Sequence, residues 1–232
     1  MNKTIIGALA ALVAITGCSQ QPPEKPASTA NWLGTITKTS SGGMLKGNPK
    51  AKVKLVVYSA LSCSGCARFW ARSNLALDAY VAAGNVSYEF RNFREDITDL
   101  PATLISRCGD PKKFFPMTAQ LFQNQTNWRG SSEVPEAVDA DAIANIPPDL
   151  LATVLATKLG LDKFAQTQGV TAEQSKACLM DNGKIDELTK VTDVAKANYG
   201  VTELPAFLIN GRRLDGAKTW EALEPALKAA GA

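Results

Sequence analysis

Residues 58–70 read Y-S-A-L-S-C-S-G-C-A-R-F-W and decide how the rest of the chain can fold. The apolar run Val53–Val57 just before them predicts a buried β-strand, and the residues after Cys66 follow a helical pattern. Cys63 and Cys66 therefore stand where a strand gives way to a helix. The start of a helix offers unpaired N–H groups and the positive end of the helix dipole, which favour a thiolate over a thiol. Since the thiolate is the nucleophile of disulfide exchange, we predict a redox-active dithiol.

The first 18 residues have the pattern of a bacterial export signal. Lys3 supplies a positive start, Ile5–Ile15 is an apolar run too short to span a bilayer, and Thr16-Gly17-Cys18 follows at once. This ending resembles the lipobox of bacterial lipoproteins, in which the cysteine becomes the lipid-modified N-terminus of the mature chain. We therefore predict a lipoprotein-type signal peptide at 1–17 and a lipid anchor at Cys18. The alternative is a soluble exported protein in which Cys18 is incidental.

Length, composition and charge limit the kinds of protein that this chain can be. The 232 residues, 45% hydrophobic and 20% charged, suit one globular domain with an insertion. Residues 18–30 are polar and rich in proline, as in a flexible tether. The formal net charge of +3 falls to about +2 without residues 1–17, so we expect no nucleic-acid binding.

Beyond the dithiol, hydrophobic periodicity predicts the order β, β, α, β, a helical block, β, β, α. The expected strands are 31–39, 53–58, 86–93, 206–210 and 212–214, and the strict alternation of 86–93 predicts that it is half-buried. The expected helices are 66–81, 100–107, 114–124, 150–159, 162–168, 172–180, 184–199 and 220–229. Thr171 and Gln174 predict a capping box. Turns are expected at 40–43 and 47–49 and a loop at 130–148.

This order of elements resembles an α/β fold, the thioredoxin fold with an inserted α-helical domain, as in bacterial DsbA-like thiol-disulfide oxidoreductases. The resemblance runs from about Trp32 to the C-terminus and rests on three matches. The first is Gly47-Asn48-Pro49, before the strand that leads to the dithiol, and the second is Arg107-Cys108 together with Phe114, Phe115 and Leu121. The third is Val201–Gly216, which reads V-T-E-L-P-A-F-L-I-N-G-R-R-L-D-G. With the export signal, it implies five parts: a signal peptide at 1–17, a tether at 18–30, a first thioredoxin-like part at 31–96, the helical insertion at 97–200 and a second thioredoxin-like part at 201–232.

The resemblance also implies a substrate site. The segment at Leu204-Pro205 looks like the family's cis-proline turn, which should face the dithiol. A cis X-Pro bond leaves the Leu204 backbone open to pair with an extended substrate peptide. Cys63 would then form a mixed disulfide that Cys66 resolves, with no cofactor and no metal.

Two departures from the family restrain this interpretation. Val57 stands six residues before Cys63, where relatives commonly keep a buried carboxylate for the proton of the second cysteine. The chain has no histidine, and Gly65 takes the place where strongly oxidising members carry an imidazole. Less positive charge near the Cys63 thiolate predicts a weaker oxidant. Glu89 or Tyr58 is the alternative group for the proton.

The other two cysteines form the natural second pair. Cys108 and Cys178 lie 70 residues apart in the helical block, where a cross-link would stabilise the fold by roughly 3 to 5 kcal/mol. We predict a structural disulfide, with a second redox pair as the alternative. A zinc site is disfavoured because it needs two more ligands, and the chain has no histidine to supply them.

The charged and aromatic residues near the dithiol have two interpretations each. Arg68 and Arg72 either hold acidic substrate segments or keep the surface solvated, and we favour the solvated surface. The aromatic side chains could form a peptide groove but are more often core: Trp70, Phe114, Phe115, Phe122 and Trp128.

Together these patterns predict an envelope thiol-disulfide oxidoreductase, a DsbA-like oxidase that introduces disulfides into exported proteins through Cys63 and Cys66. A periplasmic reductase or isomerase is the first alternative. The second is a non-catalytic Cu(I)-binding or chaperone-like lipoprotein that uses the same cysteines with Met44. We expect three partners: exported proteins with cysteines, a membrane or periplasmic redox partner, and a membrane held through the Cys18 lipid. The expected location is the bacterial cell envelope, in the periplasm.

Overall fold

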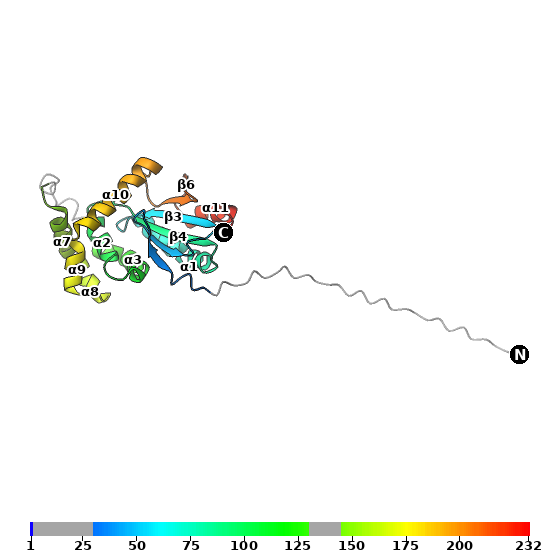
Figure 1. Cartoon of the computed structure of the whole chain (residues 1–232), viewed down its shortest axis with the longest axis horizontal. Helices are drawn as coiled ribbons and strands as arrows, with labels where there is room; N and C mark the ends of the chain where they lie inside the picture. Colours follow the sequence, from blue (N-terminus) through cyan, green and yellow to red (C-terminus); the bar gives the residue numbers. More distant parts are fainter. Residues whose placement is uncertain (2–29, 130–144) are drawn as a thin grey trace.

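The computed structural model describes Met1, residues 30–129 and residues 145–232 of the chain (Figure 1). Its strands are β1 (Ile36–Lys38), β2 (Met44–Gly47), β3 (Val53–Ser59), β4 (Val86–Asn92), β5 (Ala206–Ile209) and β6 (Arg212–Leu214). Its helices are α1 (Ser64–Ala82), α2 (Asp99–Ser106), the 3-10 helix η1 (Pro111–Lys113), α3 (Phe114–Gln123), α4 (Gln125–Arg129), α7 (Pro148–Lys158), α8 (Leu161–Thr167), α9 (Ala172–Leu179), α10 (Asn182–Tyr199) and α11 (Trp220–Ala230).

The strands form one mixed sheet in the order β1-β2-β4-β3-β5-β6. The central strands β3 and β4 run parallel and are joined by α1, while the other neighbours in the sheet pair antiparallel. Val57 of β3 stands opposite Phe90 of β4 on one side and Phe207 of β5 on the other. The dithiol therefore follows β3, one of the two central strands of the sheet, and α1 begins where this strand ends.

The two faces of the sheet carry different helices. Leu77 of α1 and Leu223 of α11 belong to the large core that includes Val57 and Phe90. Val191 of α10 belongs to a smaller cluster on the opposite face. Because successive side chains of a strand point to opposite faces, the neighbours of Val57 on β3 serve this second cluster.

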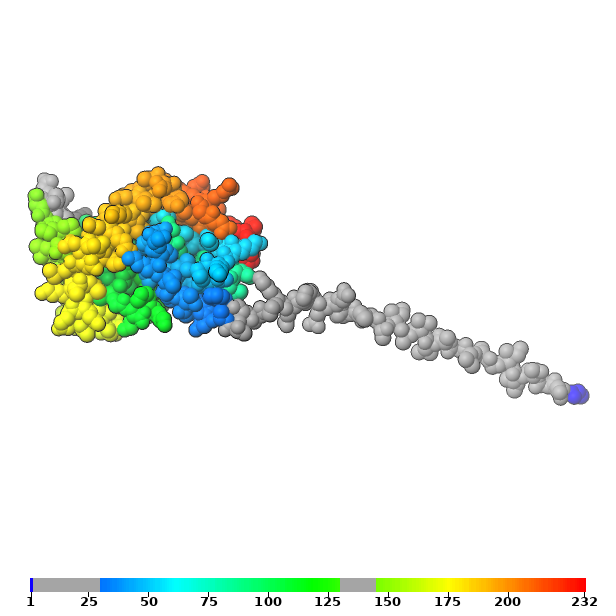
Figure 2. All heavy atoms as spheres, viewed as in Figure 1, coloured from blue at the N-terminus to red at the C-terminus, as the bar shows by residue number. Residues whose placement is uncertain are grey.

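Helices α2, α3, α7, α8 and α9 form a lobe beside the sheet (Figure 1, left), whereas α10 runs from this lobe over one face of the sheet. In the space-filling view this lobe, coloured green and yellow, lies directly against the blue and cyan surface of the sheet part (Figure 2). A disulfide joins Cys108, just after α2, to Cys178 in α9. Thr171 and Gln174 make the reciprocal hydrogen bonds of a capping box at the start of α9, as predicted. The α/β class and the thioredoxin fold with an inserted α-helical domain are confirmed.

Three expectations about the strands were wrong. The strand expected at 31–39 is confined to Ile36–Lys38, because the Asn31 carboxamide and the Trp32 carbonyl accept hydrogen bonds within a turn. Residues 44–47, to which no strand was assigned, form β2 and pair with β4. The expected half-buried strand, β4, is buried along its whole length because side chains cover both faces.

No helix in the described parts of the chain is long and apolar enough to cross a membrane. The predicted signal peptide after Met1, most of the tether with the Cys18 anchor, and most of the loop expected at 130–148 lie outside the described residues.

Candidate active site

Cys63 caps the N-terminus of α1 and is joined to Cys66 in the first turn by a disulfide with a Cα–Cα separation of 5.2 Å. The backbone of Cys63 is extended, and its Sγ accepts a hydrogen bond from the Cys66 N–H at 3.0 Å. Cys63 keeps 8% of its surface exposed, whereas Cys66 is fully buried. Of the two cysteines, Cys63 is therefore the one that a thiolate approaching from solvent meets first.

The loop before the dithiol is held from the helical insertion by Gln125. Its buried side-chain amide donates hydrogen bonds to the carbonyl oxygens of Leu61, at 2.6 Å, and Cys63, at 3.1 Å. The Cys63 carbonyl also accepts the Ala67 N–H of the helix. This amide of α4 therefore ties the strand end and the helix start to the lobe.

The loop before the dithiol is also fixed by hydrogen bonds to Asp99 in α2, which is completely buried. Its carboxylate accepts hydrogen bonds from the Ser62 N–H (2.9 Å), the Ser62 hydroxyl (2.8 Å) and the N–H groups of Glu95 (2.9 Å) and Asp96 (3.0 Å). Burial and the neighbouring Asp96 charge raise the pKa of Asp99 to about 6, although the hydrogen bonds from Asp96 and Ser62 oppose the shift. A group that titrates near pH 6 thus holds the residue next to Cys63.

The peptide bond Leu204-Pro205 is cis, as the family resemblance implies. The Leu204 carbonyl oxygen lies 3.7 Å from the point where a Cβ on Gly65 would stand, and the Cys63 sulfur lies 3.8 Å from the same point. The proline turn and the dithiol therefore face each other across Gly65, whose missing side chain leaves the space between them open.

A groove of about 700 Å³ opens from this space along α1 and the start of α11. Its charged lining residues come from several segments of the chain: Arg68, Arg72, Glu95, Glu203, Lys218 and Glu221. Four of them form ion pairs, Arg72 with Glu221 at 3.8 Å and Lys218 with Glu203 at 3.5 Å. Burial raises the pKa of Glu95. Within the described residues, Arg68 makes neither an ion pair nor a hydrogen bond.

The two groups considered for the proton of Cys66 lie on the other face of the sheet. Arg91 donates hydrogen bonds to the Glu89 carboxylate at 2.8 Å and to the Tyr58 hydroxyl at 2.8 Å. Tyr58 packs in the smaller cluster, whereas Cys63 and Cys66 belong to the large core together with Val57. Neither Glu89 nor Tyr58 can therefore serve the dithiol directly.

The remaining predicted site residues lie away from Cys63, Cys66 and the Leu204-Pro205 turn. Cys108 and Cys178 form their disulfide within the insertion, with a Cα–Cα separation of 5.7 Å and Cys108 only 3% exposed. Met44 is buried in β2, where its thioether is part of the core. Across the described parts of the chain, no group of three or more histidine, cysteine, aspartate or glutamate side chains is arranged to hold a metal ion.

Two residues at the site, Asp99 and Gln125, were not predicted. Asp99 directly precedes the helix expected at 100–107, so an acidic residue at a helix start was a usable signal. Nothing in the sequence around Gln125 distinguishes it from the neighbouring polar residues, because its partners lie more than sixty residues away.

Comparison with known proteins gives a consistent set of relatives. A family model described as thioredoxin matches residues 39–229. A provisionally named protein-disulfide oxidoreductase of Rickettsia bellii is 27% identical over 173 residues, which cover 74% of this chain and 56% of the relative. A similarly named Rickettsia typhi protein is 26% identical and is covered to 57%. The chain thus spans little more than half the length of these curated relatives.

Two solved structures share the fold. The protein-disulfide isomerase of Novosphingobium aromaticivorans superposes with a TM-score of 0.72 at 28% identity, covering 81% of this chain and 97% of that one. The α-DsbA1 protein of Wolbachia pipientis superposes with a TM-score of 0.63 at 19% identity, covering 81% and 90%. The helical insertion as well as the sheet is therefore common to these proteins.

Proposed function

Because the chain belongs to the thioredoxin family, we propose that it is a thiol-disulfide oxidoreductase of the DsbA type that acts through Cys63 and Cys66. One observation carries the proposal: the disulfide lies at the start of α1, with its more exposed cysteine, Cys63, beside the Leu204-Pro205 turn and the groove. Substrates would be exported proteins with cysteines. The names of the relatives support this activity without giving the direction of electron flow.

In the oxidising direction, a substrate thiolate attacks Cys63 Sγ and breaks the bond to Cys66, which leaves as a thiolate and is then protonated. The substrate is now held by a mixed disulfide. Its second thiolate attacks the substrate sulfur of that bond and releases the Cys63 thiolate. The substrate thiols have lost two electrons and two protons to form their disulfide; the dithiol has gained both electrons and, at Cys66, one proton, while the second proton goes to solvent as Cys63 leaves as a thiolate. The reverse sequence reduces a substrate disulfide; in isomerisation the Cys63 thiolate attacks a substrate disulfide and is displaced by a different substrate thiolate, so no electrons are transferred overall.

The Leu204 backbone would hold the substrate during these steps. An extended peptide beside Cys63 can pair with this turn through main-chain hydrogen bonds, and the groove past Gly65 can take its side chains. Buried Cys66 is shielded from a second substrate, which would favour intramolecular resolution over a side reaction.

We further propose that the protein is an envelope oxidase. The export pattern at 1–17 supports delivery to the periplasm, and the lipobox pattern at Cys18 supports attachment to a membrane through a lipid. The helix start supports a stabilised thiolate at Cys63, hence a reducible disulfide.

Trapping tests the activity. In a Cys66→Ser variant the Cys63 thiolate can still attack substrate disulfides, but Cys66 is missing and cannot displace the bound substrate, so substrate adducts should accumulate in the periplasm and disappear on reduction. A Cys63→Ser, Cys66→Ser double variant is the control. Absence of adducts in the single variant would overturn the proposal. Equilibration with glutathione gives the direction: a potential near about −270 mV, like that of thioredoxin, would exclude the oxidase.

A further inference from the structure

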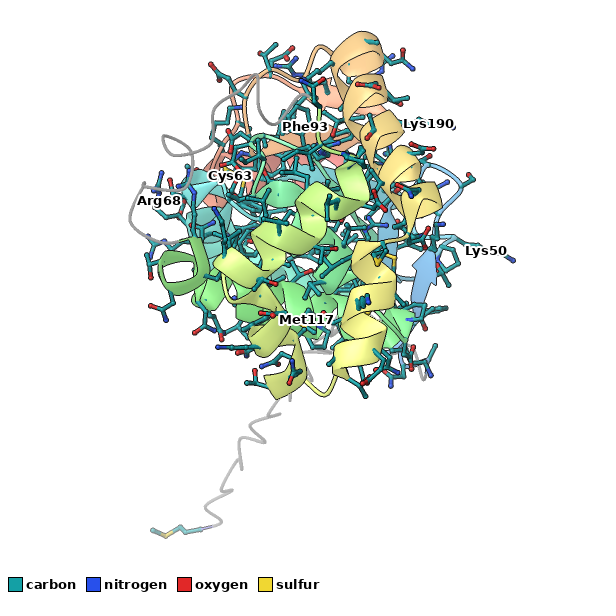
Figure 3. All side chains as sticks on the ribbon, turned by 90° about the vertical axis from the view of Figure 1, so that its left-hand side faces the viewer. Lys50, Cys63, Arg68, Phe93, Met117 and Lys190 are labelled. Atoms are coloured by element: carbon teal, nitrogen blue, oxygen red, sulfur yellow. A yellow bond between two sulfur atoms is a disulfide. The ribbon has the colours of Figure 1, made fainter. Side chains whose placement is uncertain are left out.

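The dithiol has no imidazole beside it, yet one cation does approach it. The terminal nitrogen Nη2 of Arg68 lies 3.8 Å from the point where a Cβ on Gly65 would stand, and Cys63 Sγ lies 3.8 Å from the same point. The guanidinium and the sulfur therefore share the space that Gly65 leaves empty. Figure 3 labels Arg68 and Cys63 close together on the same side of the molecule.

The other two cations that line the groove form ion pairs with acidic side chains. Arg72 pairs with Glu221 at 3.8 Å, and Lys218 pairs with Glu203 at 3.5 Å. Within the described residues Arg68 has no acidic partner to neutralise it, although it lines the same groove.

The remaining charges near the dithiol are acidic. Glu95 reaches the groove from the segment between β4 and α2, and burial raises its pKa. Asp99 contacts Ser62 in the loop before Cys63. Arg68 is thus the cation in the described structure that is free to respond to a negative charge on Cys63.

We propose that the Arg68 guanidinium, which lies beside Gly65 with the Cys63 sulfur, is the group that stabilises the Cys63 thiolate electrostatically. The inference rests on the proposed function, in which this thiolate is released when the disulfide is reduced. Stabilising it favours the reduced protein and makes the disulfide a stronger oxidant. Arg68 then supplies part of the positive charge near Cys63 that strongly oxidising family members obtain from a histidine.

The size of the effect follows from distance and exposure. Both groups lie 3.8 Å from one point, so they are at most about 8 Å apart, within the Debye length of about 10 Å at 0.1 M salt. Arg68 is exposed, so solvent weakens the attraction. We expect Arg68 to lower the pKa of the reduced Cys63 thiol by roughly half a unit to one unit, and high salt to remove most of this shift.

The test is a titration of Cys63 in the reduced full-length protein, followed by the ultraviolet absorbance of the thiolate. A Cys66→Ala background leaves Cys63 as the thiol that titrates in the dithiol motif. Arg68→Gln should raise the Cys63 pKa by roughly half a unit to one unit, and Arg68→Lys should restore most of the shift. Arg72→Gln is the matched control, because Arg72 lies one turn further along α1 and is paired with Glu221; its effect should be much smaller.

Salt and trapping separate the possible outcomes. In 1 M salt the Debye length is about 3 Å, so Cys63 should have nearly the same pKa in the Arg68→Gln variant as in the protein that keeps Arg68. Equal pKa values for Arg68→Gln and Arg72→Gln at low salt would overturn the inference, as would a shift that salt does not reduce. The titration needs no substrate, so it can fail while Cys66→Ser still traps adducts, and the two proposals are judged independently.

Discussion

Asp99 gives a stability prediction that depends on pH and can be worked through in numbers. Its pKa is about 6 in the folded protein, against an ordinary value of 3.8. Between these values the folded state holds a proton that the unfolded state has lost, so the free energy of unfolding falls as pH rises. The contribution is fully present below about pH 3.8 and is lost as pH rises through about 6. A shift of about two units corresponds to about 3 kcal/mol in total.

An Asp99→Asn variant isolates this contribution, because every other group titrates in both proteins. Asparagine keeps the shape, but its amide meets the N–H groups of Glu95 and Asp96, so the variant should be less stable throughout. The prediction concerns the slope: the stability advantage of the unmodified protein over the Asp99→Asn variant should shrink by about 2 kcal/mol between about pH 4 and pH 7. Urea unfolding of the oxidised proteins, followed by tryptophan fluorescence, measures it.

A second variant tests the cause of the shift. Ser62→Ala removes the hydroxyl that donates to Asp99 at 2.8 Å and favours the ionised carboxylate. The pKa of Asp99 should rise further, and the loss of stability should extend to higher pH. An advantage of the unmodified protein over Asp99→Asn that stays constant from about pH 4 to pH 7 would refute the reasoning. An advantage that grows with pH would show that the four hydrogen bonds outweigh burial.

Three further predictions concern other parts of the chain. Gln125→Leu leaves the buried Leu61 carbonyl without its hydrogen bond and should lower the free energy of unfolding by about 1 to 3 kcal/mol in a urea titration; an unchanged midpoint would contradict the role given to this amide. Replacing Cys108 and Cys178 together with alanine opens a loop of 70 residues and should cost about 4 kcal/mol while Cys66→Ser trapping through the dithiol persists; loss of trapping in a folded variant would favour a redox pair. Cys18→Ala should abolish the incorporation of labelled palmitate into the protein, and unchanged labelling would exclude the lipid anchor at this residue.

Local patterns predicted the elements that decide the fold. The apolar run before Cys63, the helix after it and the capping box at Thr171 depend on residues within a few positions of one another, so the sequence contains the whole signal. β2 was missed because four residues between two turns carry little periodicity, and the strand exists through its pairing with β4.

The candidate site could be predicted only in part, for the same reason. Cys63, Cys66 and the Leu204-Pro205 turn stand in recognisable motifs, although the cis bond came from family resemblance and not from spacing. Gln125 reaches the dithiol loop across more than sixty residues of sequence, so only the packed insertion brings it there. Arg68 was interpreted as a solvated surface residue, because its relation to Gly65 depends on a side-chain direction that the sequence does not contain.

Two charged groups near the dithiol act differently: Asp99, which bonds the residue before Cys63, and Arg68, which shares the space beside Gly65 with the Cys63 sulfur. Asp99 is buried, holds Ser62 by two hydrogen bonds and becomes negative above about pH 6, which disfavours a second negative charge nearby. Arg68 is exposed and keeps its positive charge, so its attraction for the thiolate depends on salt more than on pH. As pH rises through about 6 the Asp99 carboxyl becomes ionised, so its negative charge is added to that of Glu95 in opposing the attraction of Arg68 for the thiolate. Without a histidine, the oxidising strength of this dithiol should therefore depend on the balance between one buried acid and one exposed base.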